Sequence, residues 1–274
     1  MIIDAHAHAC GEFANPEILI RILDELGVAK VTLCPGLKGH TSAPPLPNIP
    51  IAAIKQSYFY SQYFINPGLR FNYNFLLKEQ QDGNQFVYSM VEKCPDRIIQ
   101  IYWLDPRKSD FMAKLKNDFD KWHFRGIKLH QVCTPFEIDN YEIEQIARFG
   151  QERQLPLFIH LRSNKDARKM MSVAKNYPDI NIVLLHLIGL EVAIEDASTL
   201  KNIHYEFSAF SYIKESRLQY AVDNLGTDRV ILGSDTPWYK DSLKNNIARV
   251  NRLSIARDEK ERILGGNTAK ILKL

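Results

Sequence analysis

Two histidines separated by a single residue stand close to the start of the sequence. His6 and His8 follow the short apolar run Met1-Ile2-Ile3 and are spaced by the small residue Ala7. Successive side chains of a β-strand point to opposite sides, so both imidazoles lie on one face of a strand. Two imidazoles on one face can bind the same divalent metal ion. So short a motif also recurs by chance, as two core or solvated histidines, and it needs support from the rest of the chain.

Three further polar residues follow apolar runs in the same way. They are His160, His186 and Asp235, which come after the runs 157–159, 182–185 and 230–234. Burying a bare imidazole or carboxylate at the end of an apolar strand is costly unless it is paired or bound to an ion. A shared metal site explains all five residues, whereas the alternative is a set of satisfied core histidines. Imidazoles with one carboxylate suit Zn²⁺ best, and Mn²⁺, Fe²⁺ or Co²⁺ also fit.

The elements that must position these residues alternate between strands and helices. Apolar runs predict eight strands, over residues 1–6, 29–34, 97–104, 125–130, 157–160, 180–186, 204–208 and 229–234. Segments of helical period predict helices over 16–27, 110–121, 141–153, 164–176, 189–201, 215–225 and 243–253. Strand-helix alternation implies a parallel sheet, because a helix supplies the crossover that parallel strands need. Eight such units predict an α/β fold of the (β/α)8 TIM-barrel type.

Residues 35–95 interrupt the regular spacing as an insertion between the second and third strands. The insertion contains a proline-rich stretch at 42–50 and an aromatic-rich stretch at 58–73. Such an insertion lies on the carboxyl face of a barrel, where it can form a lid or a wall of the substrate site. The alternatives are a pair of helices packed on the outside of the barrel, or a subunit contact. With 274 residues, the chain fits one barrel domain over 1–274.

The composition excludes several classes of function. With 35 Lys and Arg against 32 Asp and Glu, the net charge is +3 and the charges are interspersed, which argues against a nucleic-acid partner. The longest apolar stretch, 182–190, is about half the roughly 20 residues that span a membrane, and no signal peptide is recognisable. Four widely spaced cysteines argue against a disulfide framework. We therefore expect a cytoplasmic protein with reduced thiols and a small-molecule substrate, either monomeric or a homo-oligomer.

The pattern as a whole resembles the amidohydrolase superfamily, and within it the amidohydrolase-related TIM-barrel metal enzymes. That branch includes hydrolases, lactonases and non-oxidative decarboxylases of the aminocarboxymuconate-semialdehyde decarboxylase type. The resemblance covers nearly the whole chain and rests on the segments 3–8, 126–130, 158–160, 184–186, 232–238 and 266–269. It implies that His6, His8, His160 and Asp235 bind the metal. It also implies that His186 stands near the activated water or the substrate rather than on the metal.

The chemistry expected from this resemblance depends on water. A divalent ion lowers the pKa of bound water from 15.7 towards about 7 and polarises a carbonyl group. Asp235 is suited to accept the proton of that water and to deliver it to a leaving group. His186 either orients the water or stabilises developing negative charge. The leading hypothesis is hydrolysis of a lactone, ester or amide in a small carboxylated substrate, with non-oxidative decarboxylation as the alternative. The intact ligand set argues against a barrel without catalytic activity.

Lys128 and His130 share a face of the predicted fourth strand. In the binuclear branches of the superfamily a lysine of this strand is carbamylated and bridges two metals, and Lys128 holds a comparable position. The segment Gly-Ile-Lys-Leu-His is more similar to the mononuclear branch, in which the lysine stays unmodified. The alternative role of Lys128 is an ion pair with a neighbouring carboxylate such as Glu206. His130 either contacts the substrate or closes a layer of the barrel.

Arg162 follows His160 by two positions and so lies on the same face. Its guanidinium either holds a substrate carboxylate or forms an ion pair at the rim. Trp103 and Trp238, at the ends of the third and eighth strands, either stack on an unsaturated substrate or fill the barrel mouth. Cys10 and Cys34 also lie near strand ends, and we interpret them as small buried hydrophobic residues.

Overall fold

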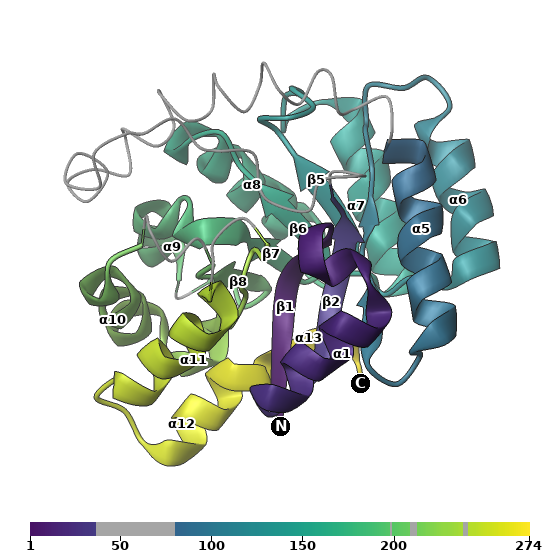
Figure 1. Ribbon diagram of the computed structural model, residues 1–274. Helices are drawn as coiled ribbons and strands as arrows, with labels where there is room; N and C mark the ends of the chain where they lie inside the picture. Colours follow the sequence, from purple (N-terminus) through teal and green to yellow (C-terminus); the bar gives the residue numbers. More distant parts are fainter. Residues whose placement is uncertain (37–79, 198, 209–212, 238–240) are drawn as a thin grey trace, which may run out of the picture.

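The computed structural model describes residues 1–36, 80–197, 199–208, 213–237 and 241–274 (Figure 1). All paired strands are parallel, in the orders β1-β2-β3 and β4-β5-β6-β7-β8-β9. The strands are β1 Ile2–Ala9, β2 Val28–Pro35, β3 Ile98–Gln100, β4 Tyr102–Trp103, β5 Ile127–His130, β6 Leu157–His160, β7 Ile182–Leu184, β8 Ile203–Glu206 and β9 Val230–Ile231. The expected parallel α/β architecture is therefore confirmed.

Backbone hydrogen bonds make the two sheet segments continuous. Ile101, which separates β3 from β4, donates its N–H to Leu33 on β2 at 2.8 Å. The next residue, Tyr102, donates to Gly126 just before β5 at 2.9 Å. β3 and β4 are thus two parts of one strand, and the described part of the chain contains the eight strands that the sequence predicts.

The first strand also pairs with the segment that follows the last strand. Ala5 donates its backbone N–H to Leu232 at 3.0 Å, and His8 donates to Thr236 at 2.8 Å. Ala7 and Thr236 form a parallel bridge. These bonds join the two ends of the sheet, as the TIM-barrel expectation requires.

The buried carboxylate of Asp4 stabilises this junction. Asp4 is fully buried, and its two oxygens accept hydrogen bonds from the backbone N–H and the hydroxyl of Ser234 at 2.9 and 2.6 Å. The backbone N–H of His6 donates to the same carboxylate at 3.2 Å. Burial raises the pKa of Asp4 to about 7, although the hydrogen bonds from Ser234 act in the opposite direction. Asp4 thus anchors the strand that carries both N-terminal histidines.

Helices surround the sheet in Figure 1, and most connect one strand to the next. The α-helices are α1 Pro16–Glu25, α5 Gln80–Lys93, α6 Phe111–Trp122, α7 Tyr141–Arg153, α8 Asn164–Asn176, α9 Leu190–Asp196, α10 Glu215–Leu225, α11 Ser242–Arg252, α12 Arg257–Glu261 and α13 Asn267–Leu272. Short 3-10 helices cover Gly11–Ala14, Leu185–Leu187 and Thr227–Arg229, and a π-helical turn covers Arg262–Gly266. Asn140 and Ser163 accept hydrogen bonds from the first turns of α7 and α8, which explains their sharp starts.

Two layers of apolar side chains fill the molecule. Phe158, Val183 and Ile231 belong to the smaller buried cluster, whereas their strand neighbours, such as Ile159 and Leu184, pack in the larger one. Because side chains alternate along a strand, one layer fills the space enclosed by the strands and the other lies between strands and helices. The strands are therefore buried on both faces.

The structure describes only the flanks of the predicted insertion. Residues 37–79, which contain the proline-rich and aromatic-rich stretches, lie outside the described residues. The following helix, α5, lies beside α6 in Figure 1 and provides the crossover from β2 to β3. Asn84 fixes α5 on the sheet, because its side-chain amide exchanges two hydrogen bonds of 2.9 Å with the backbone of Trp103. This part of the insertion is thus an outer helix.

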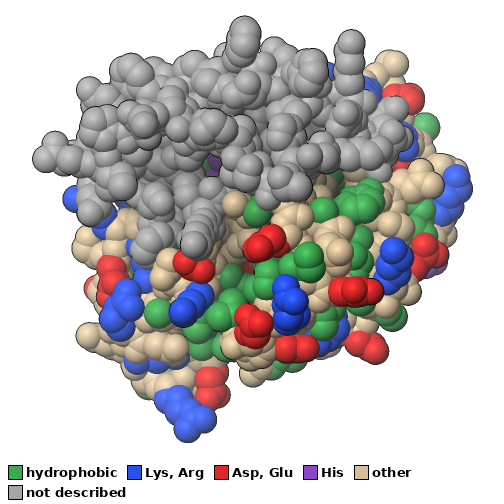
Figure 2. Space-filling model, in the orientation of Figure 1, with side chains coloured by type: hydrophobic (Ala, Val, Ile, Leu, Met, Phe, Trp, Pro, Cys, Tyr) green, Lys and Arg blue, Asp and Glu red, His purple; other side chains and the backbone are tan. Residues whose placement is uncertain are grey.

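The described surface carries both signs of charge. On the face shown in Figure 2, Lys and Arg side chains are interspersed with Asp and Glu. Several are paired, for example Arg217 with Glu191 at 2.6 Å. Among the described helices, none has the length and the apolar character needed to cross a membrane.

Candidate metal centre

Three of the expected metal ligands converge on one point at the carboxyl ends of the strands. The Oδ1 atom of Asp235 lies 3.2 Å from His8 Nε2 and 3.7 Å from His6 Nε2. His6 and His8 are each 3% exposed, and the side chain of Asp235 is 14% exposed. Closure of the sheet between β1 and the segment after β9 thus brings together candidate ligands from distant parts of the sequence.

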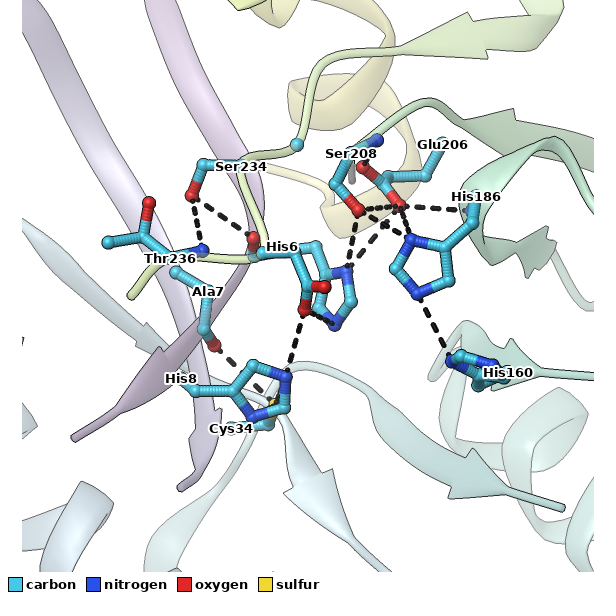
Figure 3. A network of polar contacts seen from close by, with 12 residues as sticks. His6, Ala7, His8, Cys34, His160, His186, Glu206, Ser208, Ser234 and Thr236 are labelled. Atoms are coloured by element: carbon cyan, nitrogen blue, oxygen red, sulfur yellow. Dashed lines mark hydrogen bonds and ion pairs between the residues drawn. The ribbon is translucent and has the colours of Figure 1, made fainter. Parts of the chain in front are cut away.

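His160 and His186 lie on the side of His6 that faces away from His8 (Figure 3). His160 is the last residue of β6, and its Nδ1 atom lies 3.1 Å from His186 Nε2. The ring of His186 is 5.4 Å from the ring of His6. The structure therefore gathers all five residues of the predicted rim into one cluster.

The backbone at two of these residues departs from the expected strands. β7 ends at Leu184, so His186 lies in the 3-10 helix that follows, with a left-handed φ of 59°. β9 ends at Ile231, and Asp235, with a φ of 54°, lies beyond it. Left-handed backbone at a non-glycine residue costs about 1–3 kcal/mol and is often found at functional sites. The predicted strands 180–186 and 229–234 are therefore too long at their carboxyl ends.

Glu206 and Ser208 form a polar support under the cluster. Glu206, the last residue of β8, is fully buried, and its Oε2 atom lies 3.4 Å from His6 Nδ1 and 3.3 Å from the backbone N–H of His186. The hydroxyl of Ser208 donates to the same oxygen at 2.9 Å and lies 2.8 Å from His186 Nδ1. The backbone N–H of Ser208 donates to the second carboxylate oxygen. One carboxyl group thus contacts both a metal-ligand candidate and the candidate catalytic histidine.

The space for this carboxyl group depends on a glycine. A Cβ atom at Gly233 would lie 2.6 Å from Glu206 Cδ, well inside van der Waals contact. The sequence motif at 232–235 therefore serves the site twice, because it carries Asp235 and leaves room for Glu206. From the sequence, Glu206 is expected only as a carboxylate partner for Lys128. The signal in the sequence is that Glu206 and Ser208 are two residues apart in the predicted strand 204–208, so their side chains share a face.

Hydrogen bonds at the Nδ1 atoms determine how two imidazoles face the centre. His8 Nδ1 lies 2.8 Å from the carbonyl oxygen of Pro35, which can only accept, so Nδ1 carries the hydrogen. The lone pair of His8 is then on Nε2, directed at Asp235. His6 has its Nδ1 atom against Glu206 and its Nε2 atom towards Asp235. Outer partners of this kind orient metal-binding histidines in proteins.

Three imidazoles of the cluster are neutral, the form that suits metal binding. Burial, together with the charge of Lys128, lowers the pKa of His6 well below its usual value and lowers the pKa of His160 to about 3. Burial and His160 lower the pKa of His186 in the same way. Neutral imidazole is the form that binds a metal. His8 differs, because Cys34 and Asp235 outweigh its burial and raise its pKa to about 10.

Facing lone pairs show why a cation fits here. The Nε2 lone pair of His8 and the carboxylate of Asp235 are 3.2 Å apart, so a proton or a metal ion must lie between them. Burial and the charge of Asp235 raise the pKa of Glu206 to about 8, and a nearby divalent ion would favour its ionised form. In the described part of the chain, His6-His8-Cys34 and His6-His186-Glu206 are the two triads whose ligand atoms lie within 4.8 Å of one another. The donor set therefore fits a divalent metal.

Lys128 and His130 lie side by side at the end of β5. The Nζ atom of Lys128 is 2.8 Å from His6 Nε2, and burial lowers the pKa of this lysine. His130 stacks between Trp103, with a centroid distance of 5.4 Å, and His160, at 4.1 Å. Both residues therefore share the expected face, and Trp103 and His130 build an aromatic wall against the His160 ring.

Arg162 and Trp238 are the remaining candidate substrate contacts. The guanidinium of Arg162 donates to Asp166 at 3.0 Å and to Glu137 at 3.0 Å. This geometry is the ion pair at the rim, one of the two roles expected for Arg162 from the sequence. Trp238 lies outside the described residues.

Cys34 requires a correction. It is buried, as expected, but its sulfur lies 3.3 Å from His8 Nδ1 and 4.0 Å from His8 Nε2. Cys34 is therefore more than a small buried hydrophobic residue, and no Cys–His spacing in the sequence indicates this contact. Parallel pairing of β1 and β2, which sets His8 opposite Cys34, creates the contact.

Comparisons with known proteins agree with this architecture. A family model described as Amidohydrolase matches residues 70–274, well over half of the chain. No curated protein matches the sequence.

Three solved structures illustrate the similarity of fold. A 2,6-dihydroxybenzoate decarboxylase in complex with 2,6-dihydroxybenzoate has a TM-score of 0.71 at 14% identity, covering 100% of this chain and 99% of its own. A dihydroxybenzoic acid decarboxylase from Polaromonas sp. JS666 with bound manganese and the inhibitor 2-nitroresorcinol has a TM-score of 0.67 at 15% identity, covering 100% and 97%. A probable 2-pyrone-4,6-dicarboxylic acid hydrolase from Acinetobacter baumannii, with citric acid bound, has a TM-score of 0.67 at 16% identity, covering 100% and 99%. With a family model over most of the chain and whole-chain structural matches, the protein is an enzyme of the amidohydrolase family.

Proposed function

We propose that this enzyme is a metal-dependent hydrolase of a small carboxylated substrate, acting on a lactone, ester or amide carbonyl. His6, His8, His160 and Asp235 would hold the metal, with Zn²⁺ as the first candidate and Mn²⁺, Fe²⁺ or Co²⁺ as the others. When bound, such an ion supplies Lewis acidity that activates water and polarises a carbonyl group. The observation that carries the proposal is the convergence of His6, His8 and Asp235 on one point.

Asp235 is the proton carrier in this proposal. It is the most exposed of the three converging side chains, so its carboxylate is within reach of water that enters the mouth of the barrel. A carboxylate in this position accepts a proton from the attacking water and returns it to the leaving group. Its left-handed backbone fixes the direction of this side chain.

His186 contributes a neutral imidazole of fixed orientation. Its Nδ1 and Nε2 atoms lie 2.8 Å from Ser208 Oγ and 3.1 Å from His160 Nδ1, so the ring has a defined orientation. The Ser208 hydroxyl donates to Glu206, so His186 Nδ1–H donates to Ser208 and Nε2 of the neutral ring is an acceptor. We therefore assign His186 to orienting the attacking water rather than to donating to the substrate oxygen.

Non-oxidative decarboxylation is the second candidate. It is supported by the decarboxylases among the structural neighbours, such as the two described above, each of which covers 100% of this chain. The parallel stack of Trp103, His130 and His160 also suits a planar unsaturated substrate, because flat rings stack on aromatic faces.

Metal analysis of the purified protein, with kinetics of His6→Ala and Asp235→Asn, tests the proposal. We expect about one equivalent of divalent metal in the wild type, lower metal content in both variants, and a loss of kcat/KM of at least about 100-fold. His204→Gln is the matched control, because His204 is a buried histidine that pairs with Asn181 instead. A metal-free wild type that is fully active, or variants as active as the wild type, would refute the proposal.

A substrate panel in ¹⁸O-labelled water separates the two reactions. Hydrolysis transfers the label into the product, whereas decarboxylation releases CO₂ and leaves the product without labelled oxygen. The panel should contain lactones, esters and amides with a carboxylate, and unsaturated or aromatic carboxylic acids.

A further inference from the structure

We propose that the hydroxyl of Ser208 is a positioning group that determines which ring nitrogen of His186 carries the hydrogen, and that it acts on turnover without acting on metal binding. The use of His186 to orient the attacking water rests on the proposed function. The hydrogen-bond arrangement that prepares the ring belongs to the chain itself, so it can be tested without a metal.

The hydroxyl of Ser208 lies between the ring and a buried carboxylate (Figure 3). Its Oγ atom is 2.8 Å from His186 Nδ1 and 2.9 Å from Glu206 Oε2. Both oxygens of Glu206 accept backbone N–H groups, Oε2 from His186 and Oε1 from Ser208, so this group is an acceptor for the hydroxyl as well. A hydroxyl has one hydrogen. Because that hydrogen is directed at Glu206, Ser208 accepts from His186, and Nδ1 must carry the ring hydrogen.

The placement of this one hydrogen decides what the ring can do. His186 is buried, and burial together with His160 lowers its pKa well below the usual value, so the ring is neutral and has a single hydrogen. With the hydrogen on Nδ1, the lone pair is on Nε2, which lies 3.1 Å from Nδ1 of the candidate ligand His160. A lone pair on this side can accept a hydrogen from the attacking water, whereas an Nε2–H group cannot.

The local structure fixes the hydroxyl in this position. Ser208 is fully buried and lies two residues beyond Glu206, the end of β8. Its backbone N–H and its hydroxyl both donate to the Glu206 carboxylate, one to each oxygen. Glu206 Oε2 is 3.9 Å from His186 Nδ1, which is beyond hydrogen-bond distance. Among the described residues, Ser208 Oγ is thus the hydrogen-bond partner of this nitrogen, and the carboxylate reaches the ring only through the hydroxyl.

The metal-ligand candidate His6 depends on Ser208 much less. Its Nδ1 atom is 3.4 Å from Ser208 Oγ and equally 3.4 Å from Glu206 Oε2. Loss of the hydroxyl therefore leaves His6 with a carboxylate acceptor, but it removes the acceptor of His186 Nδ1. Ser208→Ala should lower turnover and leave zinc affinity close to the wild type, whereas Glu206→Ala should lower both.

Nitrogen NMR of the imidazole rings tests the tautomer directly. Full-length protein with ¹⁵N-labelled histidine is measured metal-free and loaded with Zn²⁺, and the signals of His186 are identified by their loss in His186→Asn. Ring nitrogens with and without a hydrogen have well-separated chemical shifts. We expect the hydrogen on Nδ1 in the wild type and in Ser208→Thr, which keeps the hydroxyl, and a shift of the hydrogen towards Nε2 in Ser208→Ala. Ser89→Ala is the matched control, because the Ser89 hydroxyl donates to the carbonyl of Phe86 on the outer helix α5 at 2.7 Å.

Kinetics and chelator competition with Zn²⁺ show on which process the hydroxyl acts. With a substrate that the panel identifies, Ser208→Ala should lose about 10–100-fold in kcat, the range typical of partners that orient the histidines of a metal site. KM and zinc affinity should stay close to the wild type. Ser208→Thr should recover most of the lost kcat, and Ser89→Ala should change none of these quantities.

The outcomes separate this inference from the function on which it rests. A wild type with the ring hydrogen of His186 on Nε2 overturns the role of Ser208, and so does an unchanged tautomer or an unchanged kcat in Ser208→Ala. A zinc affinity that falls as much as kcat also overturns it. A wild type that binds no metal overturns the proposed function, whereas the metal-free spectra still decide whether Ser208 sets the tautomer. If Ser208→Ala does not fold, the wild-type spectrum decides, because hydrogen on Nδ1 supports the inference and hydrogen on Nε2 refutes it.

Discussion

Glu206 offers the most direct test of how the centre is built. Replacing it with alanine removes the acceptor of the Ser208 hydroxyl, the Ser208 backbone N–H and the His186 backbone N–H. Each buried donor left without a partner costs about 1–3 kcal/mol, and three donors lose theirs, so Glu206→Ala should lower the free energy of unfolding by at least about 3 kcal/mol. It also removes the oxygen that faces His6 Nδ1 at 3.4 Å. Loss of such an orienting group typically weakens metal binding by about 10–100-fold.

Glu206→Gln should be milder, for a geometric reason. Three groups approach Oε2, namely the Ser208 hydroxyl, His186 N–H and His6 Nδ1, whereas the Ser208 N–H approaches Oε1. The glutamine oxygen can take the crowded position, and its NH₂ group then meets only the Ser208 N–H. We expect a stability loss of about 1–3 kcal/mol and a metal affinity closer to the wild type than in the alanine variant.

Chelator competition and chemical denaturation measure the two effects separately. Asp118→Asn is the matched control, since Asp118 is a buried carboxylate on α6 that accepts from Tyr102 and Lys114 at 2.8 and 2.7 Å. It should lower stability without changing metal affinity. If Glu206→Ala binds metal as tightly as the wild type, or if Asp118→Asn weakens binding equally, the orienting role of Glu206 is wrong.

Two further predictions concern stability. Burial lowers the pKa of His204 to about 4 from an unfolded value of 6.5, so its contribution is complete above pH 6.5 and lost as the pH falls towards 4; the loss amounts to about 3 kcal/mol. Denaturation of His204→Gln between pH 7 and 4.5 should show a smaller decline than the wild type, and equal declines would contradict this reasoning. Gly233→Ala should cost about 1–3 kcal/mol because its Cβ would overlap Glu206. Gly266→Ala, where the nearest atom is at 3.5 Å, should be neutral or slightly stabilising by thermal melting, and an equal loss at both positions would show that crowding at Glu206 is not the cause.

Local signals in the sequence were sufficient for much of the fold. The predicted helices at 141–153, 164–176 and 215–225 coincide with α7, α8 and α10 because apolar spacing and start signals agree there. β6 also ends at His160 as predicted. In contrast, β7 and β9 are shorter than their apolar runs, since left-handed backbone at His186 and Asp235 depends on tertiary contacts.

The sequence was sufficient to predict which candidate ligands come together, but not which residues contact them from outside. His6, His8 and Asp235 could be identified because each follows an apolar run, and the structure brings them together. Cys34 and Glu206 were assigned differently, because their contacts with His8 and His6 depend on strand register and on closure of the sheet. Such pairings between residues far apart in sequence leave no local pattern.

The junction between β1 and the segment after β9 has a consequence for biosynthesis. Ser234 contacts Asp4 across a sequence separation of 230 residues, and Asp235 meets His8 at the same place. A nascent chain still on the ribosome therefore carries His6 and His8 long before Asp235, their carboxylate partner, has been synthesised. High-affinity metal uptake should thus be a late event, which protects the growing chain from binding an ion in an incomplete geometry.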